Sequence, residues 1–257
     1  MRSVDFNADL GESFGRWTLG DDTALLPLIS SANVACGFHA GDPAVIDETV
    51  ARCREAGVAV GAQPSYPDLQ GFGRRSMALT PREIEQIVLY QVGAVAAFCA
   101  AHGVPLTHVK PHGALYNDAV TDPVRARAIA RGVARAWPGL PLVGLAGSAP
   151  FEEAARREGL PFVPEAFADR RYLPDGTLQP RSAPGALIVD PDEAAEQALM
   201  IARDGAVRCI DGSVMTLRAE TICFHGDTPG APAIIAAARQ RLERAGIEVR
   251  SFALRSL

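Results

Sequence analysis

The stretch "SANVACGFHAGDPAVIDETVARCREAG", residues 31–57, decides the fold. It opens with a short apolar run, passes through a glycine-rich polar loop and continues as a longer segment of helical character. Asp42 precedes Pro43, which places a capping side chain directly before a proline at the first helical position. Gly57 suits the left-handed conformation that ends many helices. The stretch therefore predicts one strand–loop–helix unit, with a strand over 31–36 and a helix over 43–56.

The same unit recurs along the chain. Further short apolar runs predict buried strands over Val4–Ala8, Ala59–Ala62, Thr107–Lys110, Leu142–Leu145, Phe162–Glu165 and Thr221–His225. Further helices are predicted over Pro81–Ala101, Pro123–Ala136, Ala149–Glu158, Pro191–Arg203 and Pro229–Ala245. Four more helices are predicted to begin at a capping residue before proline, at Thr80-Pro81, Asp122-Pro123, Asp190-Pro191 and Thr228-Pro229.

Repeated strand–helix units predict a parallel sheet with right-handed crossovers. Seven or eight such units favour a closed barrel over an open Rossmann sheet. We therefore expect an α/β fold that consists of a single (β/α) barrel with seven or eight strands, regular or irregular. A dinucleotide-binding glycine motif is absent after the first strand. We expect one domain over residues 1–257, with residues 166–190 forming a long loop or small hairpin over one face.

Charge and composition narrow the classes of partner. The net charge is −5 and the sequence has no basic run, so we expect neither nucleic acid nor an anionic membrane as a partner. The N-terminus is polar, unlike a signal peptide, and no apolar run approaches the ~20 residues of a membrane span. Five cysteines without a Cys-x-x-Cys pair indicate a reduced, cytoplasmic chain.

Polar side chains follow the predicted strands at their carboxyl ends, where parallel α/β folds carry their chemistry. The segments are "FNADLGES" (6–13), "CGFHAGD" (36–42), "GAQPSYPDLQGFGRR" (61–75), "HVKPHGALYND" (108–118), "PEAFADRRY" (164–172) and "FHGDTPGA" (224–231). Because these ends meet at one face of a barrel, the segments predict a single site.

Lys110 is the only lysine, in a chain with 24 arginines. Lysine is a compact ammonium whose pKa falls when it is buried, whereas arginine stays charged and planar. Lys110 can therefore act as a proton carrier, a nucleophile or a point charge beside an oxyanion. The alternative is a surface lysine without function. On strand alternation, His108 shares the side of Lys110 and lies beneath it.

Other residues have structural alternatives. Asp42 either caps its helix or joins the site, and His39 is either a hydrogen-bonded core residue or a ligand flanked by glycines. The pairs Arg74-Arg75 and Arg170-Arg171 are either solvated or an anion clamp. The sequence leaves open whether the site binds a divalent metal ion. Asp9, Glu12, His39 and His112 are suitable types of ligand, but their spacing across separate strands matches no short ligand motif.

Six segments together resemble the LamB/YcsF family: "DFNADLGESFG", "SSANVACGFHAGDP", "SYPDLQGFGRR", "HVKPHGALYN", "EAFADRRY" and "HGDTPGA". The resemblance covers roughly residues 4–252. It implies a (β/α) barrel like those of glycoside hydrolases and polysaccharide deacetylases. It also implies a bacterial enzyme subunit that acts with two further subunits, B and C, of a 5-oxoprolinase. That complex opens the lactam of 5-oxo-L-proline to L-glutamate with ATP as co-substrate, and Mg²⁺ would accompany the ATP.

The resemblance leads to a hypothesis for the site. Lys110 would lie beside the carbonyl or phosphoryl oxygen, and either His112 or Asp9 with His39 would move the proton. An arginine would hold the substrate carboxylate. The substrate-binding residues would be Asn7, Glu12, Gln63, Arg74, Asn117, Glu165, Arg170, His225 and Asp227. Gln63 departs from the family pattern, since many relatives have histidine there. An amide can orient a substrate but cannot carry its proton.

Two other functions are open on the sequence. The chain could be a metal-dependent deacetylase or amidohydrolase with Asp9, Glu12 and His39 as ligands. It could also be a non-catalytic subunit that holds substrate for its partners.

Overall fold

A computed structural model describes residues 2–254 of the chain. The strands are β1 (Arg2–Leu10), β2 (Ser31–Ala35), β3 (Ala59–Gln63), β4 (Leu106–Val109), β5 (Leu142–Leu145), β6 (Phe162–Phe167), β7 (Ala206–Arg208), β8 (Val214–Thr216), β9 (Thr221–Phe224) and β10 (Ile247–Val249). The helices are α1 (Asp22–Leu25), α2 (Pro43–Ala56), α3 (Pro81–His102), α4 (Gly113–Thr121), α5 (Pro123–Ala134), α6 (Ala149–Arg157), α7 (Pro191–Asp204) and α8 (Ala231–Arg244), with 3-10 turns η1 (Leu26–Leu28) and η2 (Phe252–Leu254).

The strand order confirms the predicted barrel. The sheet runs β10-β1-β2-β3-β4-β5-β6-β9, and an additional β1–β9 pairing closes a ring of seven strands. The start of β1 pairs with β10, whereas Asp5–Ala8 pair in parallel with β9. All seven predicted strands belong to this ring. The short β10 and the β7–β8 hairpin were not predicted, because strands of three residues carry too little pattern to detect.

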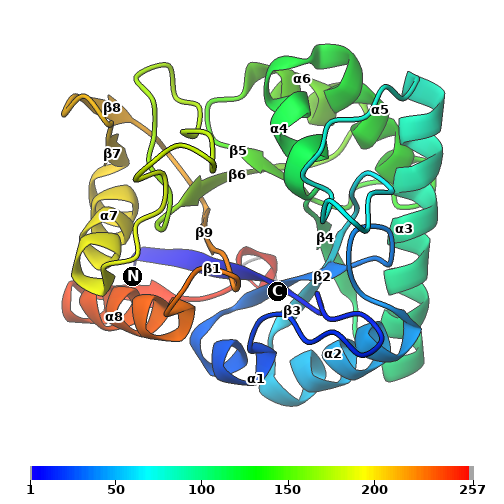
Figure 1. The fold of residues 1–257 in the computed structure, drawn as a ribbon, viewed down its shortest axis with the longest axis horizontal. Helices are drawn as coiled ribbons and strands as arrows, with labels where there is room; N and C mark the ends of the chain where they lie inside the picture. The colour runs from blue at the N-terminus through cyan, green and yellow to red at the C-terminus, as the bar shows by residue number, and fades with distance from the viewer. Residues whose placement is uncertain (1, 255–257) are drawn as a thin grey trace. The chain divides into compact units, whose positions relative to one another are not determined.

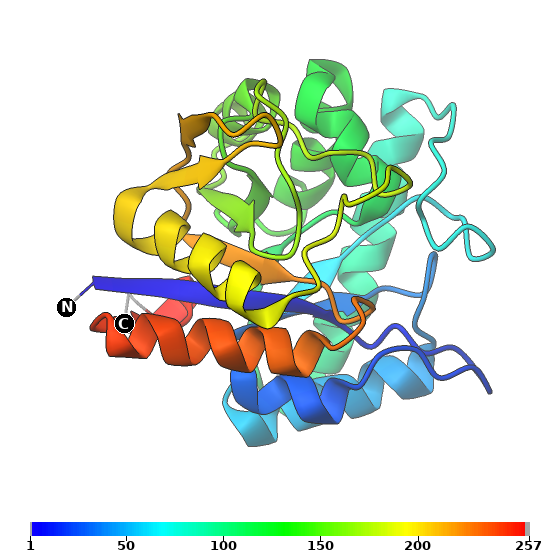
Figure 2. The ribbon, with the colours of Figure 1, turned by 60° about the vertical axis from the view of Figure 1, so that its left-hand side comes forward.

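The chain consists of two compact units, and the expectation of one domain over 1–257 stays a prediction. Of the described residues, unit 1 comprises 2–8, 21–31 and 164–254, and unit 2 comprises 9–20 and 32–163. In unit 1, α7 and α8 lie side by side (Figures 1 and 2). In unit 2, β3 pairs with β4, and α3 packs against α2 and α5 (Figure 1).

Strand β1 is longer than predicted and carries alternating polar residues. It extends to Leu10, so Asp9 lies within the strand rather than after it. Asp5, Asn7 and Asp9 are two residues apart, which directs their side chains to one side of the strand. All three are buried. A buried polar side chain requires hydrogen-bond partners, and each of the three has one.

Most predicted helix starts are confirmed. Thr80 and Glu83 form a capping box, and Asp42 accepts hydrogen bonds from the first backbone N–H groups of α2. The Thr228-Pro229 start is wrong. Helix α8 begins at Ala231 after Gly230, because the Thr228 hydroxyl donates instead to Asp169 (2.9 Å).

Helix α4 was not predicted, and it changes the setting of Asn117. The segment after His112 turns at once into this helix, and Asn117 lies exposed on it rather than in a loop.

Helix α3 is long and apolar enough to cross a membrane by length and composition, although the sequence showed no uninterrupted apolar run of that size. It packs against β3, α2 and α5 within unit 2. A helix that packs in the layer around a barrel passes the same test, so this finding is weak evidence for a membrane.

Gly61 leaves the space that His108 occupies. The two residues are partners in the β3–β4 pairing, and a Cβ added at Gly61 would lie 2.1 Å from His108 Nε2. We expect Gly61→Ala to lower the free energy of unfolding by about 1–3 kcal/mol, the usual cost of overpacking a core.

Urea denaturation would measure this loss, with Gly93→Ala as the control. A Cβ at Gly93, within α3, meets Trp137 at an ordinary 3.7 Å. Alanine favours a helix over glycine, so the control should keep or increase stability. Equal effects of the two variants would contradict the steric argument.

Candidate active site

A buried ion pair lies in unit 2. Asp9 comes from the end of β1 and Lys110 from the position just after β4, and Lys110 Nζ lies 3.3 Å from Asp9 Oδ1. Lys110 is 3 % exposed and Asp9 is 6 % exposed. The alternative of a surface lysine is therefore wrong. Lysine fits here because its ammonium is compact, whereas a planar guanidinium needs more room.

A chain of polar contacts orients Asp9. Asn33 on β2 donates from Nδ2 to Asp9 Oδ1 (3.0 Å), and its Oδ1 lies 2.9 Å from His108 Nε2. Because an amide oxygen only accepts, Nε2 of His108 carries the hydrogen. The other ring nitrogen lies 2.8 Å from the Thr107 hydroxyl. His108 thus lies beneath the ion pair on the side of Lys110, as strand alternation predicted.

Two stacked histidines lie beside the ion pair. The rings of His39 and His112 are 4.1 Å apart and nearly parallel, at 14°. His112 Nε2 donates to the Phe72 carbonyl (3.0 Å). In the neutral ring this leaves a lone pair on Nδ1, which lies 3.8 Å from Asp9 Oδ2 and 4.0 Å from Glu12 Oε1. These separations are electrostatic contacts, too long for hydrogen bonds.

Phe72 fixes this pair. Its ring meets both histidine rings edge-on, at 5.7 Å for His39 and 5.1 Å for His112. Among residues 2–254 it is the one residue other than glycine with a positive φ, 54°. Such a backbone conformation costs energy and occurs often at functional sites.

The histidines are held neutral. Burial lowers the pKa of His39 well below its usual value, and the neighbouring His112 lowers it further, while Asp9 opposes both. Burial also lowers the pKa of His112, against the attraction of Asp9. Neutral imidazoles can accept a proton or bind a metal ion, so both rings are chemically available.

His39 and Gln63 point to a ligand. Both are buried, at 1 % and 0 % exposure. The Gln63 amide is near enough to His39 to raise the pKa of that histidine. However, no hydrogen bond to a described residue is made by either ring nitrogen of His39 or by either polar side-chain atom of Gln63. An unpaired buried polar group costs about 1–3 kcal/mol, and a bound ligand with polar groups would remove that cost.

The same cluster could hold a metal ion. Three side chains, those of Glu12, His39 and His112, each offer one ligand atom, and these three atoms lie within 4.8 Å of one another. A carboxylate with two neutral imidazoles suits zinc and similar divalent ions. The Nε2–H bond of His112 to a backbone carbonyl is the usual support of a metal-bound histidine. The structure groups Glu12 and His39 with His112, while Asp9 contacts Lys110 and Asn33.

An exposed arginine lies near the histidines. Arg74 stands over the Phe72 ring at 4.8 Å, and its charge helps to lower the pKa of both His39 and His112. Arg75 instead pairs with Asp68. Of this predicted arginine pair, Arg74 is therefore the better placed to meet an anionic ligand.

The remaining predicted residues lie in unit 1. Asn7 donates to Glu165 (3.0 Å) and to Thr221 (2.6 Å). Three further predicted residues also have partners in unit 1. Arg170 donates to the Gln179 carbonyl, and Asp227 pairs with Arg181. His225 contacts Asp169.

Asp5, Asn33 and Asp169 were not among the predicted site residues, although Asp169 lies in the predicted polar segment 164–172. Asp5 accepts hydrogen bonds from Ser30 and Ser31, each at 2.7 Å, within unit 1. Alternation of polar residues along β1, at Asp5, Asn7 and Asp9, is the signal that could have identified an inward polar row.

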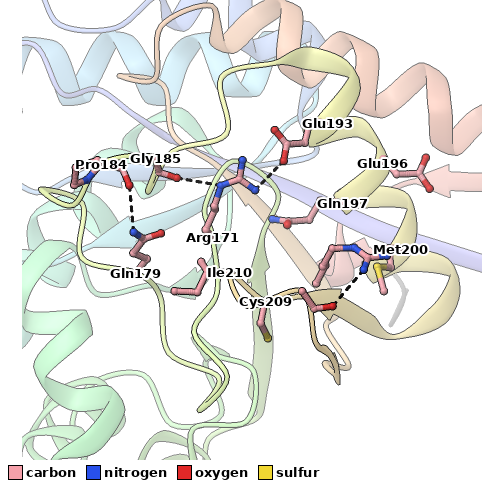
Figure 3. Close-up of a pocket in the computed structure, with 12 residues that line it drawn as sticks. Arg171, Gln179, Pro184, Gly185, Glu193, Glu196, Gln197, Met200, Cys209 and Ile210 are labelled. Carbon is pink, nitrogen blue, oxygen red and sulfur yellow. Dashed lines mark hydrogen bonds and ion pairs between the residues drawn. The ribbon is translucent and has the colours of Figure 1, made fainter.

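Unit 1 also contains a pocket between α7 and the loop after β6 (Figure 3). Arg171 lies at its centre, where it pairs with Glu193 (2.7 Å) and donates to the Gly185 carbonyl (3.0 Å). Gln179 donates to the Pro184 carbonyl. Its polar groups are largely paired with one another, so this pocket is a weaker candidate than the histidine cluster.

The fold and the cluster define a (β/α) barrel protein with a buried, charged site at the carboxyl ends of its strands. The sequence profile of the LamB/YcsF family matches residues 4–256, and the chain belongs to that family.

Close relatives extend this result over nearly the whole chain. A protein of Chloroflexus aggregans, named as the A subunit of 5-oxoprolinase, is 59 % identical over 251 residues, which is 98 % of this chain and 99 % of the relative. A protein of the same name from Mycobacterium avium is 53 % identical over 98 % of this chain and all of its own. The crystal structure of a lactam utilization protein from Thermus thermophilus matches with a TM-score of 0.92 and 54 % identity, over 97 % of this chain and 100 % of that one.

The burial of His108 gives stability a defined pH dependence. Burial, with a smaller effect of Lys110, lowers the pKa of His108 from 6.5 to about 3. As the pH falls below 6.5, the unfolded chain takes up a proton that the folded chain does not. This residue should therefore lower the free energy of unfolding by about 1.4 kcal/mol per pH unit as the pH falls toward 3.

Urea denaturation of the protein and of His108→Gln between pH 7 and pH 4 would test this. Glutamine keeps an N–H toward Asn33 but does not titrate. The pH slope of the variant should be smaller by about one proton, and equal slopes would contradict the assignment.

Proposed function

We propose that this chain is the lactam-binding and lactam-opening subunit of an ATP-dependent 5-oxoprolinase, which converts 5-oxo-L-proline to L-glutamate. The observation that carries the proposal is the similarity to relatives named as the A subunit of 5-oxoprolinase and to a lactam utilization protein. These proteins are 53–59 % identical to this chain over nearly its full length. The buried cluster around Asp9 and Lys110 supplies the types of group that the reaction requires.

The chemistry explains the need for ATP. A lactam carbonyl is a weak electrophile because the amide is resonance-stabilised. Transfer of the γ-phosphoryl group of ATP to the amide oxygen, with release of ADP, makes the ring carbon open to attack by water. The C–N bond then breaks and the nitrogen leaves with a proton as the amine. Hydrolysis of the remaining acyl phosphate releases phosphate and completes glutamate.

Lys110 is assigned to the lactam or phosphoryl oxygen. Its ammonium is buried, with Asp9 Oδ1 at 3.3 Å. In such a site a fixed positive charge stabilises a developing oxyanion far better than in water. Asn33 and Asp9 hold that charge in place.

The histidines are assigned to the proton. His112 has its Nε2 hydrogen fixed by Phe72, so Nδ1 is the basic atom, and Asp9 and Glu12 nearby stabilise the ring once it is protonated. Gln63 would orient the ligand through its unpaired amide, a role that does not require the histidine of other relatives. Arg74 would hold the substrate carboxylate.

The wider setting is part of the same proposal. The word subunit in the names of the relatives favours a multisubunit complex, and we assign the partners to subunits B and C of that enzyme. ATP, with Mg²⁺, is the co-substrate of the complex. Five free, buried cysteines fit a cytoplasmic location.

Lys110→Arg tests the role of the compact ammonium. We expect the variant to keep its thermal unfolding midpoint within a few degrees and to lose at least about 10²-fold in glutamate release, as when an oxyanion-stabilising group is lost. The assay uses 5-oxo-L-proline and ATP with this chain co-purified with its partner subunits.

Arg127→Lys on the exposed face of α5 is the matched control and should leave turnover unchanged. Normal turnover of Lys110→Arg would remove Lys110 from the chemistry. If variants at Asp9 and His39 also kept full activity, the chain would hold the substrate without supplying catalytic residues.

The cluster of Glu12, His39 and His112 favours a second candidate function, that of a metal-dependent amidohydrolase. A bound divalent ion would polarise the carbonyl and activate water. On this alternative, Zn²⁺ added to the metal-free protein should bind one equivalent by calorimetry, and chelation should abolish activity.

His112→Gln should remove at least about 10-fold of that zinc affinity, because it deletes a ligand nitrogen. His102→Gln, which alters the histidine paired with Asp47 at the end of α3, is the matched control. Equal zinc affinity in the protein and in His112→Gln would exclude this set of ligands.

A further inference from the structure

Unit 1 contains a second cluster of chemically active side chains, at the carboxyl ends of β6 and β9. These strands pair in parallel, with Glu165 opposite Thr221 and Phe167 opposite Cys223. The chain segments that leave the two strands therefore emerge together. They deliver Asp169 from one strand and His225 from the other.

Asp169 is a buried carboxylate with donors on several sides. It is 1 % exposed and accepts hydrogen bonds from the His225 backbone N–H (3.0 Å) and the Thr228 hydroxyl (2.9 Å). His225 Nδ1 lies 3.0 Å from each of its two oxygens. Burial opposes its ionisation, but the attraction of His225 and these donors lowers the pKa of Asp169 below its usual value. Asp169 is therefore ionised and can only accept.

The ionised carboxylate fixes the tautomer of His225. Because Asp169 cannot donate, Nδ1 of the histidine carries the hydrogen. In the neutral ring the lone pair is then on Nε2. No hydrogen bond joins Nε2 to another residue within 2–254, and the side chain is 13 % exposed, so a small molecule can reach this edge.

The surroundings hold the dyad rigidly. The His225 ring lies nearly parallel to the Phe167 ring, at 5.4 Å and 15°. Gln197 on α7, labelled in Figure 3, donates to the carbonyls of Phe167 and Arg170, each at 2.8 Å. The Tyr172 hydroxyl accepts from the Phe167 backbone N–H (2.8 Å). Preorganisation by a supporting layer is typical of functional groups.

We propose that Asp169 and His225 form a proton-transfer dyad, with His225 Nε2 as the proton carrier and Asp169 as the positioning residue. The ligand is a small molecule with an exchangeable O–H or N–H. The Nε2 lone pair forms an N–H bond as the ligand's O–H or N–H bond breaks. Asp169 balances the charge of the imidazolium, and the proton then returns to the leaving atom or to water.

Charged side chains of both signs lie near the dyad. Arg170 is 7 % exposed and is attracted to Asp169, and Arg181 lies near enough to repel Arg170. Arg181 forms two hydrogen bonds with Asp227, at 2.8 and 3.0 Å. The titratable groups near Arg170 are thus Arg181, Asp169, Tyr172 and Cys223. If the proposed function holds, on which this step rests, the ligand is the lactam acid or its opened product.

A purely structural role is the competing explanation. Asp169 orders the turn over 225–228, and its bonds to the His225 N–H and the Thr228 hydroxyl already serve that purpose. These two bonds do not involve the imidazole. The two explanations therefore differ in what removal of Nε2 alone would do.

His225→Asn makes this distinction. The asparagine amide can donate to Asp169 where Nδ1 does, but it has no atom equivalent to Nε2. In the complex with partner subunits we expect the thermal midpoint to be kept while glutamate release falls about 10²–10⁴-fold. Thr228→Val, which loosens the turn but keeps the imidazole, should retain most of the turnover. Wild-type turnover in His225→Asn would overturn the proposal.

A second measurement does not depend on the substrate. Nitrogen NMR of the histidine side chains in the full chain should show His225 with a protonated Nδ1 and an unprotonated Nε2, and His225→Asn assigns the signal. The opposite tautomer would overturn the dyad even in an active complex. If the unmodified complex released no glutamate, the proposed function would fail, and the tautomer would still decide the dyad.

Discussion

The ion pair between Asp9 and Lys110 is the interaction on which the site in unit 2 depends. Bringing two charges out of water costs several kcal/mol for each ion, and their attraction offsets this only if further hydrogen bonds complete the arrangement. Asn33 supplies one such bond to Asp9. Its amide must then be oriented by a donor on its other side, which is Nε2 of His108. The His108 ring in turn requires a residue without a side chain opposite it on the neighbouring strand, and that residue is Gly61.

This sequence of requirements explains why a chain that otherwise uses arginine has a lysine at 110. The buried Asn33 amide contacts Asp9, and the buried His108 ring contacts that amide. The positive charge is needed at Asp9 Oδ1. A guanidinium is a larger, planar group with five N–H donors, whereas the ammonium is a compact point charge. The ammonium meets the requirement with a smaller group.

The fold was largely predictable because its signals are local. Each strand of the ring is a short apolar run, and Asp42, Thr80 and Asp122 mark helix starts by chemistry that acts over three residues. The start of α8 could not be predicted in the same way. The Thr228 hydroxyl has a partner, Asp169, that is 59 residues away in the sequence. Local patterns carry no information about such a partner.

The site was predictable in membership more than in geometry. Polar residues at strand ends identified Asp9, His39, Lys110 and His112, which the structure brings together in unit 2. The roles of Asn33 and Phe72 depend on tautomers and on a backbone carbonyl. Neither can be read from residue types. Asn117 had the expected composition and position, but an unpredicted helix leaves it exposed.

The two units differ in how far their buried polar groups are satisfied by hydrogen bonds. In unit 2, His39 and Gln63 are buried with unpaired polar atoms, so the site is incomplete until a ligand supplies partners. In unit 1, Asp169 is already satisfied by three donor groups, and the free atom of His225 lies at an accessible edge. A site of the first kind gains binding energy from its ligand, because unpaired groups acquire hydrogen bonds. A site of the second kind gains little on binding but needs no reorganisation when a proton moves, since the charge that balances the imidazolium is already in place.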